Sequence, residues 1–168
     1  MTTNVIIICG FAGSGKSTLC DGLAKKLGWK AIHASDILRQ IRKKKMEEID
    51  IAHTKAGKGF WESEEAMKYN QERMKNLDWD KLVNEKLYEL VEEGNVVFDS
   101  WTLPWLTPHG LKIWLKVSFE SRAKRLAERD GIPVQAVKQK IVEKEKGTTE
   151  IFKKAFGFEF GKDLTPFH

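Results

Sequence analysis

Residues 5–18 read VIIICGFAGSGKST, and this stretch decides the fold. Its first five residues form an apolar, mostly β-branched run, which predicts a strand covered on both faces. Gly10 to Ser17 then fit the pattern G-x-x-x-x-G-K-[ST] at every fixed position, and a helix is predicted from Lys16 to Leu27. A glycine-rich turn that leads from a buried strand into a helix is the arrangement that holds phosphate groups.

The turn is expected to bind phosphates mainly through its backbone. Successive N–H groups and the positive end of the following helix attract anions, and glycines leave room for a phosphate to approach. The Lys16 ammonium would reach the β and γ phosphates of a nucleotide, and the Ser17 hydroxyl would ligate Mg²⁺. The residues expected to hold ATP here are Gly10, Phe11, Ala12, Gly13, Ser14, Gly15, Lys16, Ser17 and Thr18.

Apolar runs and amphipathic stretches alternate along the rest of the chain, which is typical of an α/β protein. Further strands are predicted over 29–33, 95–99 and 111–117, helices over 36–48, 62–91, 119–129 and 134–146, a loop over 100–110 and a tail over 147–168. We therefore expect a single domain over residues 1–168. Its class is a three-layer P-loop NTPase fold with a mainly parallel sheet flanked by helices.

The chain has 168 residues, 29 Lys and Arg against 24 Asp and Glu, and a formal net charge of +5. A chain of this length buries a core without disulfides, so we expect Cys9 and Cys20 to be free thiols. The apolar run at 5–9 is too short for a signal peptide or a membrane span, which predicts a cytoplasmic protein with no membrane partner. The basic run from Arg39 to Lys45 is either a solvated helix face or a phosphate-binding surface.

Three polar residues are expected at the carboxyl edge of the sheet, where open α/β proteins bind ligands. Asp99 ends a predicted strand and would act as a catalytic carboxylate that holds a magnesium-bound water or faces the acceptor. Asp36 and Arg39 follow the second predicted strand, and Arg39 would fork onto the phosphate of an acceptor substrate. The alternatives are a helix or turn cap for Asp99 and an ordinary surface ion pair for Asp36 and Arg39.

Arg122, Arg125 and Arg129 are spaced by three and four residues, so they lie along one face of a predicted helix. A row of guanidiniums facing a triphosphate would bind it and neutralise charge that develops during transfer, although solvent-exposed arginines show the same spacing. Trp61 and Trp101 are expected near the acceptor, where a planar base would stack on them. Packing in a core or loop is the commoner role of tryptophan.

On these segments the chain resembles the archaeal type of cytidylate kinase, one of the nucleoside monophosphate kinases. The resemblance runs from Val5 to about Asp163 and is carried by GFAGSGKST, LAKKLG, SDILR, the strand that ends at Asp99, and LKIWLKVSFESRAKRLAERD. It implies transfer of the γ-phosphate of ATP, with Mg²⁺, to a CMP-like nucleoside monophosphate.

The resemblance also implies a division of the chain and of its site. The core would comprise about residues 1–35 and 94–128, an NMP-binding region about 36–93, and a LID that closes over ATP about 129–157. Asp36 and Arg39 would belong to the monophosphate site. Arg125 would lie against the adenine, and Arg129 near the transferred phosphate.

The chain departs from the family pattern at several of these places. Ser35-Asp36 stands where Gly-Asp is common, and Ser100-Trp101 stands where Gly-Arg is common. In the LID, Lys144-Glu145 replaces Arg-Glu and Ile151-Phe152 replaces Arg-Tyr. Lysine keeps a charge but loses the bidentate fork of arginine, and isoleucine keeps neither, so the acceptor half of the site is expected to be altered.

The resemblance further implies one more core strand and a final helix after the LID, and no such segment follows the LID here, so either the chain is truncated or its sheet has one strand fewer. A missing fifth strand would leave the apolar side of the fourth, including Ile113 and Leu115, without cover. A second copy of the chain would supply that cover in a homodimer.

Two other functions remain open at this point. A kinase for a hydroxyl acceptor, such as a nucleoside, would use Asp36 or Asp99 to accept the hydroxyl proton. An ATP-dependent RNA-binding or assembly factor of adenylate kinase type would use the basic run from Arg42 to Lys45 and the phenylalanine-rich tail.

Overall fold

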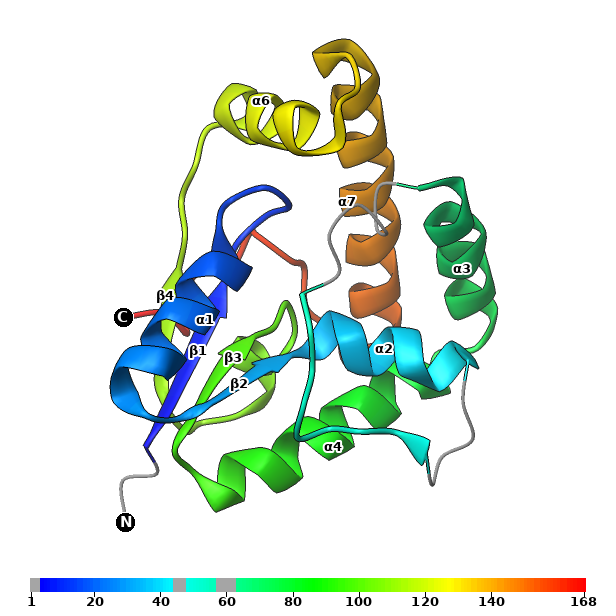
Figure 1. Ribbon diagram of the computed structural model, residues 1–168. Coiled ribbons are helices and arrows are strands. Elements are labelled where there is room, and N and C mark those ends of the chain that lie inside the picture. Colours follow the sequence, from blue (N-terminus) through cyan, green and yellow to red (C-terminus); the bar gives the residue numbers. More distant parts are fainter. Residues whose placement is uncertain (1–3, 44–47, 57–62) are drawn as a thin grey trace.

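The computed structural model describes residues 4–43, 48–56 and 63–168 (Figure 1). The elements, in chain order, are β1 (Val5–Cys9), α1 (Lys16–Leu27), β2 (Lys30–His33), α2 (Ala34–Lys43), α3 (Glu64–Lys75), α4 (Asp78–Glu93), β3 (Val96–Asp99), α5 (Leu103–Leu106), β4 (Leu111–Trp114), α6 (Phe119–Asp130) and α7 (Val134–Phe156). This alternation of strands and helices confirms the predicted α/β class.

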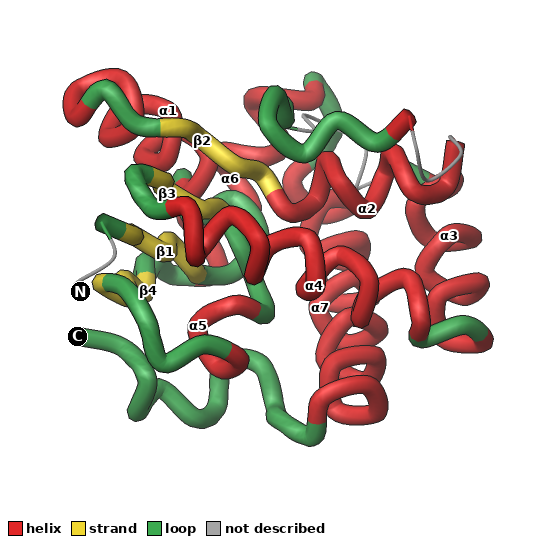
Figure 2. The backbone as a smooth tube through the Cα atoms, turned by 90° about the horizontal axis from the view of Figure 1, so that it is seen from below, coloured by secondary structure: helices red, strands yellow, loops and turns green. Residues whose placement is uncertain are grey.

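Within the described residues the sheet has four parallel strands in the order β2-β3-β1-β4. Alternate side chains of the strands point to opposite faces. Ile8 and Val97 pack with Cys20 of α1 on one face, whereas Ile7 and Phe98 belong to the core formed with α2 and α4 on the other. Figures 1 and 2 show the resulting three layers, with the sheet between α1 and α4.

Because the strands are parallel, their carboxyl ends meet at one edge of the sheet. The glycine-rich turn follows β1 there, α2 follows β2 directly, and the α6–α7 hairpin stands above the same edge (Figure 1). Tyr69 of α3 and Leu87 of α4 are buried with the sheet residues, which fixes the helices that flank this edge. The fold therefore surrounds the carboxyl edge with helix residues from several directions.

Three local predictions need correction. The tail expected from residue 147 begins later, because α7 continues through Gly147 to Phe156. Ile151 and Phe152 are buried on that extension. The free energy gained by burying these two side chains exceeds the cost of about 1 kcal/mol for a glycine inside a helix. A short helix, α5, forms inside the predicted loop around the fully buried Leu103, and β4 ends at Trp114 rather than at residue 117.

The described residues contain no fifth strand, as the sequence predicted, and the segment 157–168 lies against β4 instead. The backbone N–H of His168 donates to the Lys112 carbonyl at 3.0 Å, and the Lys112 N–H donates to Nδ1 of His168 at 3.2 Å. Phe160 and Phe167 pack on Trp114, with ring centroids 5.6 and 5.3 Å apart. The C-terminal segment thus covers part of the outer edge of β4 and the face that carries Trp114. Leu115, for which cover was predicted, packs instead with Ile8 and Cys20 on the other face, and the homodimer stays a prediction.

Cys9 and Cys20 are both free and buried, which confirms the prediction of reduced thiols. Burial raises the pKa of both, that of Cys20 to about 12. In the part of the chain that the structure describes, no helix is both long enough and apolar enough to cross a membrane.

Candidate active site

The glycine-rich turn has a backbone that other residues would not tolerate. Gly10 has a φ of +147°, and a Cβ there would lie 2.8 Å from the Leu115 carbonyl oxygen. Gly13 has a φ of +76°, and its Cβ would lie 2.9 Å from the Arg122 carbonyl oxygen. The turn is therefore tightly backed by the residue that follows β4 and by α6, and only glycine leaves its N–H groups accessible to an anion.

The side chains of the turn also fit a bound phosphate. The hydroxyl of Ser14 is buried and has no hydrogen-bond partner among the described residues. Lys16, at the start of α1, reaches back along the turn, and its Nζ donates to the Phe11 carbonyl at 3.2 Å. A phosphate would offer the Lys16 ammonium a stronger acceptor than this carbonyl, because hydrogen bonds that involve ions are stronger than neutral ones, whereas Ser14 is not among the described residues that line the cavity in front of the turn.

Ser17 and Asp99 meet beside this turn. The Ser17 hydroxyl donates to Oδ2 of Asp99 at 2.6 Å, which joins the start of α1 to the end of β3. Burial raises the pKa of Asp99, but the Lys16 ammonium and the hydrogen bonds from His33 and Ser17 outweigh it, so the pKa lies below its usual value. Asp99 is thus ionised at neutral pH, and with the Ser17 hydroxyl it forms an oxygen donor set that suits Mg²⁺.

His33 joins the same group, although sequence reasoning did not select it. Its Nδ1 lies 3.4 Å from Oδ2 of Asp99, and its Nε2 lies 2.9 Å from Oδ1 of Asp21. Burial lowers the pKa of His33, but hydrogen bonds and charge from the two carboxylates more than offset this, so its pKa is raised. No local motif marks His33, because its partners are 12 and 66 residues away in sequence.

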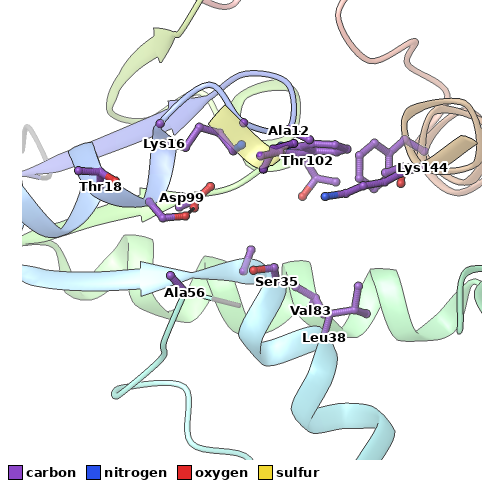
Figure 3. A pocket seen from close by; sticks show the side chains of 18 of the residues that line it. Ala12, Lys16, Thr18, Ser35, Leu38, Ala56, Val83, Asp99, Thr102 and Lys144 are labelled. Carbon is purple, nitrogen blue, oxygen red and sulfur yellow. Dashed lines mark hydrogen bonds between the residues drawn. The ribbon is translucent and has the colours of Figure 1, made fainter. Parts of the chain in front are cut away.

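A cavity of about 350 Å³ opens in front of the turn (Figure 3). It extends from the turn across the ends of β2 and β3 to α3, α4, α6 and α7. Figure 3 shows Lys16 and Lys144 reaching into it from opposite sides, with Leu38 and Val83 below. The residues predicted from the sequence that line it are Ala12, Gly13, Gly15, Lys16, Ser17, Thr18, Asp99, Trp101, Arg125 and Arg129.

A second group of lining residues was missed by the sequence analysis and lies away from the turn. Arg73 of α3 and Asp80 of α4 are 3% and 4% exposed and form a bidentate ion pair, with N···O distances of 3.1 and 2.5 Å. Asn84 donates to the Asp80 carbonyl at 2.8 Å and accepts from the Thr102 hydroxyl at 2.6 Å. The far half of the cavity is therefore polar and held by a connected network.

Other predicted residues lie outside the described lining. Asp36 and Arg39 pair with each other at 2.5 Å and also hold residue 55: the Arg39 guanidinium donates to the Lys55 carbonyl, and Asp36 accepts from the Lys55 N–H. Their neighbour Ser35 does line the cavity. Trp61 belongs to a part of the chain outside the described residues.

Gly10, Phe11 and Ser14 of the turn are not among the described residues that line the cavity. The three arginines of α6 also differ in whether they line the cavity. Arg122 is 5% exposed and sits under the turn, where its guanidinium donates to the Ala12 carbonyl at 2.9 Å and to Glu145 of α7 at 2.6 Å. Burial raises the pKa of Glu145 by more than the nearby Arg122 charge lowers it.

Arg125 and Arg129 both line the cavity, and Arg129 also pairs with the adjacent Asp130 at 2.6 Å. The arginines on one face of α6 therefore have two environments, one buried beneath the turn and one facing the cavity.

Trp101 forms a wall of the cavity near two cations. The Nζ atoms of Lys16 and Lys144 lie 5.4 and 5.5 Å from the centroid of its ring, and Phe160 stacks on it with centroids 4.5 Å apart. The two lysines add positive charge beside the indole, and cations are attracted to its face.

The sequence matches the family described as an AAA domain over residues 6–152. It is 33% identical to a cytidylate kinase of Thermococcus kodakarensis over 156 residues, which are 92% of this chain and 72% of the relative. It is 32% identical to a cytidylate kinase of Pyrococcus abyssi over 156 residues, which are 92% of this chain and 77% of that one.

Among solved structures, shikimate kinase from Bacteroides thetaiotaomicron superposes with a TM-score of 0.54 at 18% identity, over 92% of this chain and 84% of that one. The superposition confirms the P-loop α/β fold. The sequence relatives add the activity class, so the chain is a kinase enzyme that transfers a phosphoryl group and uses a nucleotide. Because the domain match and the cytidylate kinase relatives both span most of its length, the chain belongs to the family of P-loop nucleotide kinases that contains the archaeal cytidylate kinases.

Proposed function

We propose that the enzyme transfers the γ-phosphate of ATP, in the presence of Mg²⁺, to the phosphate of a CMP-like nucleoside monophosphate. The observation that carries this proposal is the continuous cavity, which connects the phosphate-binding turn with the polar network on α3 and α4. Lys16 and Asp99 lie at the turn end of the cavity, where the donor triphosphate would bind, and the network on α3 and α4 would face the acceptor nucleotide.

The residues at the centre suit phosphoryl transfer between phosphates. An acceptor phosphate is already ionised at neutral pH, so its attack needs no general base, and catalysis depends on positioning and electrostatics. Lys16 would bind the β and γ phosphates, while Arg125 and Arg129 would neutralise charge on the transferred group. Ser17 and Asp99 would hold Mg²⁺, which when bound screens the negative charges of the donor phosphates.

The far half of the cavity supports a base that carries an amino group. Asp80 accepts hydrogen bonds only and lines the cavity together with Asn84 and Arg73, whose guanidinium bonds to both Asp80 oxygens, so the amino group of a base would share these acceptors with Arg73. The amino group of cytosine can donate to a carboxylate, whereas the carbonyl at the same position of uracil cannot. Leu38 and Val83 supply an apolar surface for the flat face of the base (Figure 3). CMP is thus favoured over UMP, in keeping with the names of the relatives.

We assign the regions of the chain accordingly. Residues 36–93 would form the NMP-binding side, residues 129–157 the LID over ATP, and the remainder of the domain the core. Asp36 and Arg39 would act at the acceptor site by holding the segment that ends at Ala56, which lines the cavity. A phosphate that reached Arg39 would have to compete with Asp36, its 2.5 Å partner.

The test is an acceptor panel with MgATP and the purified chain. We expect turnover with CMP and dCMP, weaker turnover with UMP, and none with cytidine or shikimate, measured as ADP release and by identifying the phosphorylated product. Turnover of cytidine without CMP would replace the proposal by a hydroxyl kinase, for which Asp99 is the carboxylate nearest the turn.

A binding role for RNA has a separate test. Salt-dependent RNA binding that is lost on charge reversal at Arg42 and Lys43, without turnover of any acceptor, would favour the assembly-factor alternative. The remaining lysines of that basic run, Lys44 and Lys45, lie outside the described residues.

A further inference from the structure

The sheet places His33 directly beside Asp99. β2 and β3 are parallel neighbours, and their register pairs His33 with Asp99, so both side chains leave the sheet on the same face at adjacent positions. The backbone N–H of His33 donates to the Thr54 hydroxyl at 2.7 Å, which fixes the end of β2 from its outer side. The imidazole is 1% exposed and therefore has no access to solvent.

The contacts of Asp99 divide unequally between its two oxygens. Oδ2 faces both the Ser17 hydroxyl at 2.6 Å and Nδ1 of His33 at 3.4 Å. Oδ1 makes no hydrogen bond with any residue that the structure describes, and Asp99 lines the cavity. Holding Oδ2 from two directions fixes the plane of the carboxylate and leaves Oδ1 for a ligand in the cavity.

The other side of the imidazole is anchored as well. Nε2 lies 2.9 Å from Oδ1 of Asp21, whose side chain is 59% exposed on α1. α1 begins with Lys16 and Ser17, so the His33 ring bridges the helix that carries the phosphate-binding residues to the strand that carries Asp99. A carboxylate–imidazole–carboxylate row of this kind fixes the orientation of the ring and of the acid beyond it.

We propose that His33 is a positioning residue, which orients the Asp99 carboxylate so that Oδ1 faces the divalent cation bound with the nucleotide. The inference rests on the proposed function only in requiring a cation beside the nucleotide phosphates, and it does not depend on which acceptor is used. His33 touches neither nucleotide nor metal in this arrangement. Its effect passes through Asp99.

A separate metal site at the same residues is a weaker interpretation. Cys20, Asp21 and His33 bring ligand atoms within 4.8 Å of one another. The Cys20 thiol, however, donates to the Val97 carbonyl at 3.3 Å, and burial raises its pKa to about 12. A thiol must lose its proton to ligate a metal, so this group of side chains does not suit a cation.

Two substitutions of His33 separate the loss of its hydrogen bond to Asp99 from a change in the packing of its side chain. His33→Leu fills the space but removes both ring nitrogens. His33→Asn places its amide N–H near the position of Nδ1, so it keeps a donor to Asp99 and loses the contact with Asp21. His109→Leu is the matched control, because His109 is exposed and lies before the amino end of β4, at the opposite edge of the sheet.

The readout is binding of Mn²⁺ in the presence of a non-hydrolysable ATP analogue, followed by electron paramagnetic resonance, with kcat and the KM values for ATP and for the acceptor measured separately. We expect His33→Leu to bind Mn²⁺ about tenfold more weakly, His33→Asn to stay within about threefold of the wild type, and His109→Leu to be unchanged. In His33→Leu kcat should fall by a similar factor, with KM for the acceptor unaltered.

Wild-type Mn²⁺ affinity in a folded His33→Leu chain would overturn the inference, and so would equal losses in the Leu and Asn variants. If His33→Leu does not fold, His33→Gln takes its place, because its amide N–H matches Nε2 and not Nδ1; wild-type Mn²⁺ affinity in that variant refutes the proposal. The defect in Mn²⁺ binding is measured without acceptor. It therefore stands even if the wild type fails to phosphorylate CMP, and only the acceptor assignment then fails.

Discussion

Replacing Arg122 by methionine tests whether this residue supports the phosphate-binding turn or contacts the nucleotide. In the structure its guanidinium is buried and bonded to the Ala12 carbonyl and to Glu145, with its centre 5.0 Å from the centroid of the Phe11 ring. Methionine keeps most of the apolar stem and removes the charge. The substitution thus deletes both hydrogen bonds and leaves the Glu145 carboxylate, 16% exposed, without its cation.

Removing one partner of a buried ion pair costs about 3–5 kcal/mol. Glu145 can take up a proton instead of remaining charged, and its pKa is already raised, so we place the loss for Arg122→Met near the lower limit, about 3 kcal/mol. In a domain of this size that corresponds to a fall in Tm of about 6–12 °C. Glu145→Gln, which keeps an acceptor for Arg122, should cost less, about 1 kcal/mol.

Urea unfolding followed by circular dichroism measures these losses, and a double-mutant cycle with both substitutions isolates the coupling between Arg122 and Glu145. We expect a coupling of at least about 1 kcal/mol and a modest rise in KM for ATP, because the Ala12 carbonyl loses its donor. An unchanged free energy of unfolding together with a large rise in KM for ATP would refute this reasoning. Arg122 would then contact the nucleotide, as the spacing of the arginines predicts.

The raised pKa of Glu145 predicts how the free energy of unfolding changes with pH. The native state binds this proton more tightly than the unfolded state, so Glu145 contributes stability at pH below its usual value near 4.5. That contribution is lost as pH rises from 4.5 through the higher native pKa. The difference in unfolding free energy between wild type and Glu145→Gln should therefore fall over this interval. A difference in unfolding free energy that grew with pH would contradict this prediction.

Three further predictions concern the turn and the thiols. Lys16→Ala should lower kcat by at least about 10³ and leave the circular dichroism spectrum unchanged, because the conformation of the turn depends on its glycines and not on the lysine. Gly13→Ala should lower the unfolding free energy by about 1–3 kcal/mol from its positive φ, with a further loss from contact with the Arg122 carbonyl, whereas Gly15→Ala, with open space around its Cβ, should show the smaller loss in urea unfolding. Cys9 and Cys20 should react with a thiol reagent only on unfolding, since burial raises the pKa of both; rapid labelling of the native chain would contradict their placement.

The phosphate-binding turn could be predicted from sequence because its chemistry is local. The strand, the glycines, Lys16 and Ser17 all lie within residues 5–18, so the pattern carries its own structural context. Asp99 could be predicted at the carboxyl edge because it ends an apolar run, and the structure places it 2.6 Å from the Ser17 hydroxyl. For these residues, it was enough to know where each strand ends in the sequence.

Residues whose partners depend on tertiary packing could not be found in this way. His33 is next to Asp99 only because β2 and β3 pair in one particular register, and sequence alone does not give that register. The ion pair of Arg73 with Asp80 joins two helices across a turn, where the sequence shows only charges on amphipathic stretches. Arg122 shows a related difficulty, because a spacing of three or four residues defines a helix face without saying what that face contacts.

The aromatic residues explain how the altered half of the site remains ordered. The resemblance predicts an arginine at position 101, where this chain has tryptophan, and a guanidinium there would lie against the ring of Phe160. An indole instead stacks on that ring at an interplanar angle of 20°. Phe160 belongs to the segment that also packs on Trp114 of β4.

The segment that covers the edge of the sheet thus also supports a wall of the cavity. Positive charge near this wall comes from Lys16 and Lys144, whose Nζ atoms lie 5.4 and 5.5 Å from the centroid of the Trp101 ring. Trp101 therefore lies where apolar packing from the C-terminal segment meets the positive charge of two lysines. A change in how residues 157–168 pack on β4 should consequently shift Trp101 in the cavity wall, because Phe160 of that segment stacks on Trp101.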